Sequence, residues 1–244
     1  MQQKTAAIIV AGGDSTRMGE IPKQFIRLCE KETILHTVLA FQKTKCIDEI
    51  IVVCREQDEE RMHSLVTVTQ FPKLKGFARG GVTRQQSVQN GISLVSGDIS
   101  HIAVHDGARP LVTGELITRT VENARKYGAS APGIPVKDTI KTVSSDGFIT
   151  GTPNRSSLYA IQTPQVFEKI LYLRAMEAAN TIGASYTDDC ALIEAADQPV
   201  FVTPGEYTNL KITTPDDIPA AQAILMEREK NGGGGVLDEN RAWL

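Results

Sequence analysis

Two cations and two glycines gather near the N-terminus in a pattern that suits phosphate chemistry. An apolar run at residues 6–11 leads into Gly12 and Gly13, and Arg17 and Lys23 follow. A buried strand that ends in a glycine-rich turn brings bare backbone N–H groups against a phosphate. The two cations then lie where further phosphate charge needs neutralising. The stretch favours a phosphate-binding loop over the alternative, a strand–turn–helix without chemistry, and the rest of the chain must decide between them.

A carboxylate and an arginine follow a second apolar run, at residues 101–104. Asp106 lies near the C-terminal end of this predicted strand, where it can hold Mg²⁺, an ion that takes one or two carboxylates together with phosphate oxygens. Arg109 can fork onto a phosphate. The alternative is an Asp–Arg pair that only holds the loop. For His105, a structural role is favoured over a catalytic one.

Three further positions could contact a nucleotide. Gly80 follows a short predicted strand at residues 77–80, and Ser87 lies one turn into the next predicted helix, where its hydroxyl can meet a base or a sugar. A plain capped helix explains the same residues equally well. Lys211 lies in an alternating stretch, residues 207–212, which we predict to be a strand that presents the lysine to a phosphate.

The order of apolar patches predicts the scaffold that positions these groups. Strand-like and helix-like patterns alternate along the first half of the chain, which favours an α/β fold with a mostly parallel sheet and helices on both faces. The loops after the strands then meet at one edge, where such folds bind ligands. The predicted strands are residues 6–11, 48–53, 77–80 and 101–104, and the predicted helices are residues 33–42, 56–65, 83–95 and 114–127.

The alternation fails after Gly128, where a projecting arm is predicted at about residues 136–158. Residues 136–143 and 148–152 have the composition of two strands around a turn at residues 145–147. A hairpin of this kind cannot bury itself alone, so we favour an arm that packs against a second copy of the chain. The alternative is an excursion that folds back on its own chain.

Composition limits the remaining classes of function. The net charge of −3 argues against a broad nucleic-acid surface, and apolar runs are too short for a membrane span. The four cysteines lack metal-ligand or C-x-x-C spacing, as expected for thiols in a reducing cytoplasm. We predict one domain over residues 1–230 and a disordered glycine-rich tail over residues 231–244.

Together the residues describe a nucleotide site for phosphoryl or nucleotidyl transfer. A glycine-rich loop with Arg17 and Lys23, a carboxylate for metal at Asp106 and a distant Lys211 are the parts required. We find no Ser–His–Asp or Cys–His pattern. A phosphate monoester is already an anion near neutral pH, so as a nucleophile it needs no general base. The protein must instead supply charge neutralisation and alignment.

The chain resembles the family of 2-C-methyl-D-erythritol 4-phosphate cytidylyltransferases of the non-mevalonate isoprenoid pathway. The resemblance covers residues 5–226 and implies a Rossmann-like sheet, attack of the sugar phosphate on the α-phosphate of CTP, release of pyrophosphate, and Mg²⁺ or another divalent cation as cofactor. It rests on seven segments in order, namely AGGDSTRMGEIPKQF, GGVTRQQS, VHDGARP, VKDT, NRSSLYAIQTPQVF, TDD and YTNLKITTPDD.

The resemblance also implies a role for each matching residue. Arg17 and Lys23 match cations on the triphosphate and its transition state, and Lys211 matches the lysine on the α-phosphate. Asp106 matches the residue near Mg²⁺ and the sugar phosphate. The implied nucleotide contacts are Ala11, Gly12, Gly13, Gly80, Ser87 and Asp106. The implied sugar-phosphate contacts are Arg109, Thr139, Arg155 and Thr163, with Arg155 supplied by the partner subunit of a homodimer.

Competing interpretations share parts of this pattern. Cytidylyl transfer to ribitol 5-phosphate uses the same phosphate-handling residues, but Ala108 and the intact Thr187-Asp188-Asp189 favour the methylerythritol substrate. A non-catalytic nucleotide-binding regulator predicts loss of the cations, which are present. A dehydrogenase is disfavoured because the glycines do not follow G-x-G-x-x-G.

Overall fold

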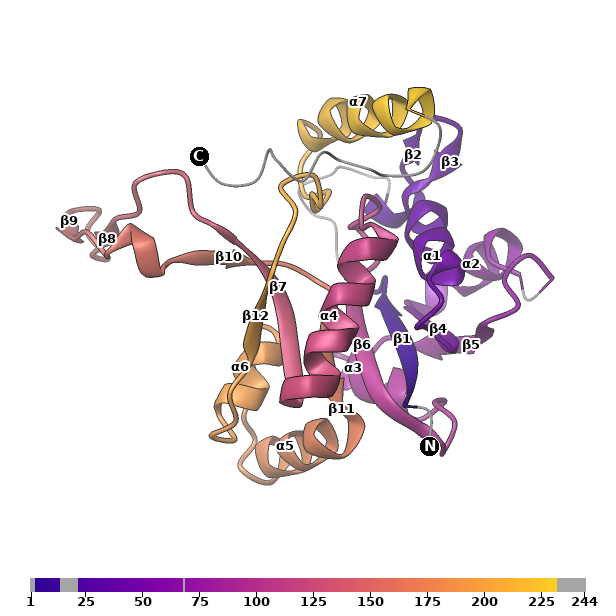
Figure 1. Cartoon of the computed structure of the whole chain (residues 1–244), viewed down its shortest axis with the longest axis horizontal. Coiled ribbons are helices and arrows are strands. Elements are labelled where there is room, and N and C mark those ends of the chain that lie inside the picture. The colour runs from indigo at the N-terminus through magenta and orange to yellow at the C-terminus, as the bar shows by residue number, and fades with distance from the viewer. Residues whose placement is uncertain (1–2, 14–21, 68, 232–244) are drawn as a thin grey trace.

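The fold is described from a computed structural model of the chain, which places residues 3–13, 22–67 and 69–231 (Figure 1). Within this part of the chain the central element is an eight-stranded sheet, in the order β10-β7-β11-β6-β1-β4-β5 with β12 paired to β7. The strands are β1 (Lys4–Val10), β4 (Glu49–Cys54), β5 (Leu74–Arg79), β6 (Ile99–Asp106), β7 (Ala129–Pro135), β10 (Tyr159–Ile161), β11 (Gln165–Glu168) and β12 (Phe201–Pro204).

Most neighbouring strands in this sheet are parallel. β1 is parallel to β4 and β6, β4 is parallel to β5, and β12 is parallel to β7. β11 runs antiparallel to both β6 and β7, and β10 runs antiparallel to β7. The predicted mostly parallel sheet is therefore confirmed, with an antiparallel strand inserted between β6 and β7.

Helices cover both faces of the sheet, as predicted. Alternate side chains of β1 point to opposite faces, so Ala7 and Ile9 belong to one buried cluster and Ala6 and Ile8 to the other. The first face is covered by α1 (Thr33–Lys43), α2 (Glu59–Leu65) and α4 (Gly114–Tyr127). The second is covered by α3 (Arg84–Ile92), α5 (Lys169–Thr181) and α6 (Asp189–Glu194). Such burial on both faces explains why the strands are continuous apolar runs.

A smaller unit covers the sheet edge where the strands end. The hairpin β2 (Arg27–Leu28) and β3 (Lys31–Glu32) packs with α7 (Asp217–Lys230) around the buried side chains of Leu28, Leu111 and Ile212. Short 3-10 turns lie at η2 (Lys23–Phe25), η3 (Glu56–Asp58) and η4 (Arg155–Ser157). Among the residues placed, no helix has the length and apolar character needed to cross a bilayer.

The predicted arm projects from the body, as Figure 1 shows at its left side. Its far end is the hairpin of β8 (Thr142–Val143) and β9 (Ile149–Gly151). The predicted turn is confirmed, because Gly147 has φ +87° and its N–H donates to Ser144 O over 3.0 Å. The predicted strand over residues 136–143 is wrong in its first part, since residues 136–141 pair with no neighbouring strand.

One further expectation from the sequence is wrong, and the structure adds two features. Residues 207–212 form no strand, because side-chain contacts rather than a ladder hold this segment. Asp188 caps α6, with its Oδ1 accepting from Ala191 N over 2.9 Å. The strands β7 and β10, which the pattern of residues 128–165 did not reveal, extend the sheet into the base of the arm.

Candidate active site

A cavity of about 270 Å³ opens at the sheet edge where β1 and β6 end. Two backbone hydrogen bonds hold its floor together: Ala11 N donates to Val53 O over 2.7 Å, and Gly107 N donates to Val10 O over 2.8 Å. Polar and charged side chains from distant parts of the chain line this cavity. The lining residues are Val10, Ala11, Gly12, Gly13, Lys23, Gln24, Gly81, Val82, Thr83, Arg84, Ser87, Asp106, Ala108 and Lys211.

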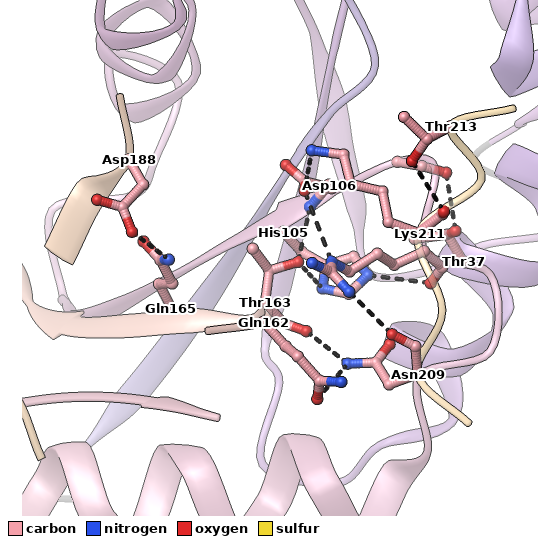
Figure 2. A network of polar contacts seen from close by, with 12 residues as sticks. Thr37, His105, Asp106, Gln162, Thr163, Gln165, Asp188, Asn209, Lys211 and Thr213 are labelled. Carbon is pink, nitrogen blue, oxygen red and sulfur yellow. Dashed lines mark hydrogen bonds and ion pairs between the residues drawn. The ribbon is translucent and has the colours of Figure 1, made fainter. Parts of the chain in front are cut away.

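Lys211 and Asp106 form an ion pair in the cavity wall. Lys211 Nζ lies 2.8 Å from Asp106 Oδ2, as Figure 2 shows. The Lys211 side chain is 41% exposed, so the pair contributes little net stability, about 1 kcal/mol or less. The ammonium can therefore leave Asp106 for an arriving phosphate at small cost.

Two partly buried arginines also face Asp106. Arg109 Nε lies 3.6 Å from Asp106 Oδ2, and Arg84 Nη2 lies 3.8 Å from Oδ1. Burial pushes the pKa of Asp106 upward, but the charges of Lys211, Arg84 and Arg109 outweigh it and hold that pKa well below its usual range. Asp106 is therefore a permanent carboxylate with a surplus of cations around it.

The neighbouring His105 is a structural residue. Its Nε2 lies 3.2 Å from Arg109 O, an acceptor only, so Nε2 carries the proton. Nδ1 must then accept from the Thr163 hydroxyl, 3.0 Å away, and the Thr163 oxygen accepts in turn from Asp106 N over 3.1 Å. Burial lowers the pKa of His105 to about 3, so the ring is neutral. The expected structural role of His105 is confirmed.

Side-chain anchors place Lys211 without a strand. Asn209 Nδ2 donates to Thr163 O over 3.0 Å, and Arg109 Nη1 donates to Asn209 O over 2.8 Å. Ile212 N donates to Ala108 O over 2.8 Å. The segment that carries Lys211 is thus fixed directly to the loop that follows Asp106, which explains why the two side chains meet.

On the opposite wall, Ser87 organises the glycine loop before α3. Ser87 Oγ accepts from Gly81 N over 2.9 Å and donates to Thr83 O over 2.9 Å. Gly80 N donates to Cys54 O over 2.8 Å, which ties this loop to the end of β4. These hydrogen bonds fix the loop at residues 80–83, and residues 81–83 of it line the cavity.

Sequence comparisons identify relatives of the chain. Residues 5–227 match the family model for 2-C-methyl-D-erythritol 4-phosphate cytidylyltransferase. A relative of that name from Desulforamulus reducens is 42% identical over 224 residues, which are 91% of this chain and 96% of the relative. The chain belongs to this family. Its relative in Caldanaerobacter subterraneus is 44% identical over 223 residues, 90% of this chain and 98% of the relative.

Solved structures support the same assignment. The crystal structure of 4-diphosphocytidyl-2C-methyl-D-erythritol synthase from Anaerococcus prevotii has a TM-score of 0.82 and 33% identity, covering 92% of this chain and 97% of that one. The 2-C-methyl-D-erythritol 4-phosphate cytidylyltransferase from Thermus thermophilus has a TM-score of 0.74 and 27% identity, covering 93% and 100%. The α/β, Rossmann-like fold expected from the sequence is confirmed.

The site residues predicted from sequence that the structure describes divide into three groups. Those that meet at the cavity are Ala11, Gly12, Gly13, Lys23, Ser87, Asp106 and Lys211. Gly80, Arg109 and Thr163 are not among the lining residues, and the Thr163 hydroxyl is occupied by Asp106 and His105. Thr139 and Arg155 lie on the exposed arm, where Arg155 Nη1 donates to Lys137 O over 3.0 Å. Arg17 lies outside the described residues.

Sequence reasoning assigned no role to Arg84, which the structure places in the cavity wall. Its position gives a signal: it is the first residue of α3, after the cap Thr83. A cation is disfavoured at a helix N-terminus by the helix dipole. An arginine there is explained by nearby carboxylates, here Asp106 and Asp189.

Proposed function

We propose that the protein transfers a cytidylyl group from CTP to the phosphate of 2-C-methyl-D-erythritol 4-phosphate. The products are 4-diphosphocytidyl-2-C-methyl-D-erythritol and pyrophosphate. The observation that supports this best is the convergence of Lys23, Lys211 and Asp106 on one cavity in a chain of this family. We assign the activity to a single domain over residues 1–230, working in the cytoplasm without a nucleic-acid or membrane partner.

The reaction needs charge neutralisation rather than a general base. An oxygen of the substrate phosphate forms a bond to the α-phosphorus of CTP, the bond from that phosphorus to the β-phosphate oxygen breaks, and its electron pair leaves with pyrophosphate. Lys211 turns from Asp106 to the α-phosphate, while Lys23 and Arg17 neutralise charge that develops on the phosphates. The backbone of Ala11, Gly12 and Gly13 lies along the same wall.

Asp106 fits a divalent cation such as Mg²⁺. Its carboxylate is ionised, and its side chain remains 14% exposed at the cavity. No cluster of three or more metal-ligating side chains exists among the residues placed, which suits Mg²⁺, since this ion takes one or two carboxylates and completes its shell with substrate phosphates and water. When bound, the ion would neutralise phosphate charge and orient the triphosphate.

The sugar-phosphate half of the site is proposed to form between two subunits. The arm exposes apolar side chains that its own chain does not cover, among them Val143, Phe148 and Ile149 at 56%, 73% and 65% exposure. Apolar surface of this kind is typical of an interface. Packing of the arm on a second copy would bring Arg155 and Thr139 to the partner's cavity, next to Arg109 and Asp106.

The activity is tested by incubating the purified chain with CTP, Mg²⁺ and each sugar phosphate while measuring pyrophosphate release. We expect turnover with 2-C-methyl-D-erythritol 4-phosphate to exceed turnover with ribitol 5-phosphate. Faster release with ribitol 5-phosphate would contradict the proposed substrate. Absence of release with either substrate, in protein that binds CTP, would favour a non-catalytic regulator.

Sharing of the site between subunits is tested by mixing two variants. Arg155→Ala should chiefly raise the KM for the sugar phosphate, and Asp106→Ala should lower turnover. In a mixed dimer one site contains both native side chains, so activity should recover when the two variants exchange subunits. Exchange without recovery would show that each chain builds its own site.

A further inference from the structure

A buried charge network lies behind the cavity, centred on Asp189 at the start of α6. The residue is 2% exposed. Tyr172 on α5 donates its hydroxyl to Asp189 Oδ1 over 2.6 Å, and Arg84 Nη1 donates to Oδ2. A buried carboxylate is strongly disfavoured without such partners. Arg84 is the cation that pairs with this carboxylate among the residues placed.

Arg84 connects this network to the cavity. One terminal nitrogen contacts Asp189, and the other lies 3.8 Å from Asp106 Oδ1. Burial would lower the pKa of Arg84, but Asp189 and Asp106 outweigh it and raise that pKa, so the guanidinium stays charged. The same cation therefore balances one carboxylate in the core and one carboxylate of the site.

Gln165 fixes Asp189 relative to Asp106. Gln165 Oε1 accepts from Asp189 N over 3.0 Å, and its Nε2 donates to Asp188 Oδ2 over 3.0 Å, as Figure 2 shows for the latter contact. Gln165 begins β11 and pairs with Val104 of β6, the strand that ends at Asp106. The start of α6 is thus attached to the strand that carries the site carboxylate.

We propose that Asp189 is a positioning residue for Arg84, holding its guanidinium beside Asp106 throughout turnover. The inference rests on the proposed function, in which Lys211 leaves Asp106 for the α-phosphate. Asp106 then loses its closest cation and needs Arg84 to remain. Without the Asp189 carboxylate, Arg84 is no longer fixed at its distance from Asp106, and the charge balance at Asp106 changes as the transition state forms.

The test is a kinetic comparison of Asp189→Asn with the native chain. The asparagine keeps an oxygen for the Tyr172 hydroxyl but removes the charge that holds Arg84. We expect kcat to fall about 10-fold with KM for both substrates within about 2-fold, since the change affects the transition state rather than substrate binding. The matched control is Asp98→Asn, which removes an exposed carboxylate paired to Lys4 at the other end of β6 and should leave kcat unchanged.

A double-mutant cycle separates positioning from general stability. If Asp189 acts through Arg84, adding Asp189→Asn to Arg84→Gln should lower kcat no further, whereas losses that add would overturn the proposal. Tyr172→Phe, which keeps the carboxylate but removes one of its anchors, should lower kcat about 3-fold at unchanged KM, and it supplies the test if Asp189→Asn does not fold.

The outcomes distinguish this proposal from the proposed function. An inactive native chain contradicts the function itself. An active native chain with normal kcat in folded Asp189→Asn, or in Tyr172→Phe if Asp189→Asn does not fold, contradicts only the role of Asp189. A lowered melting temperature with normal kcat per folded molecule identifies Asp189 as a structural residue and also overturns the proposal.

Discussion

Replacing Thr163 by valine should destabilise the fold by removing one hydroxyl that forms hydrogen bonds with two neighbouring residues. The side chains have nearly the same shape, so the change leaves packing intact and removes only hydrogen bonds. The Thr163 hydroxyl accepts from Asp106 N and donates to His105 Nδ1. β11 begins at Gln165, beyond this point, so no strand carbonyl takes over the Asp106 N–H.

The size of the effect follows from these two contacts. A buried polar group that loses its partner costs about 1–3 kcal/mol. Thr163 is 4% exposed and His105 is fully buried, so water does not replace the lost contacts freely. Thr163→Val leaves two such groups without a partner, the Asp106 N–H and His105 Nδ1. It also removes the cost of burying the hydroxyl, so we expect the free energy of unfolding to fall by about 3 kcal/mol.

Thr120→Val is the matched control for this measurement. Thr120 is also buried, but its hydroxyl donates to Leu116 O, a carbonyl inside α4 that also accepts in the helix. Its loss leaves no group unpaired and should cost less than about 1 kcal/mol. Urea unfolding of both variants at neutral pH measures the two free energies. Equal stability of Thr163→Val and Thr120→Val would refute the bridging role of the hydroxyl.

Three further outcomes are expected. Lys23→Ala and Arg17→Ala should each lower turnover at least ~10²-fold in the pyrophosphate assay, and near-normal turnover would remove them from the mechanism. Gly91→Ala should lower the urea midpoint by an amount equivalent to about 1–2 kcal/mol, because a Cβ there meets a core methyl at 2.7 Å, whereas Gly97→Ala, with open space around it, should be neutral. Burial and a neighbouring arginine lower the pKa of His101 below 6.5, so the unfolded chain binds the proton first and stability should fall as pH drops below that value. His101→Gln should make this fall shallower when unfolding is compared at pH 7 and pH 5, and an unchanged slope would contradict the assignment.

The sequence reveals most of the scaffold because local patterns determine it. Strand β1 is a continuous apolar run since both of its faces are buried, and α4 was predicted with its exact bounds by its apolar stripe. Strand β7 was missed because it contains two prolines and a glycine, residues that are unfavourable in strands. Its pairing with β10, β11 and β12 overrides that local preference.

The site was predicted only where its residues carry a local signal. Lys211 was assigned to a phosphate role because it is a lysine in an alternating stretch. The strand predicted for that stretch is wrong, so the residue type was the useful signal. Arg84 received no role because its meaning depends on Asp189, which is 105 residues away in the chain. Contacts of such separation arise because α3, α5 and α6 share one face of the sheet, which a single sequence does not display.

The base of the arm has a consequence for how this family can diversify. Tyr159–Ile161 pair with Gly133–Pro135, so the points where the arm leaves and rejoins the body lie side by side. The entropy of closing the loop between them grows only slowly with its length, and doubling that length costs about 0.6 kcal/mol. Insertions and substitutions beyond this base are therefore thermodynamically inexpensive for the body. Surfaces on the arm can change over evolution while the cavity beneath it keeps its geometry.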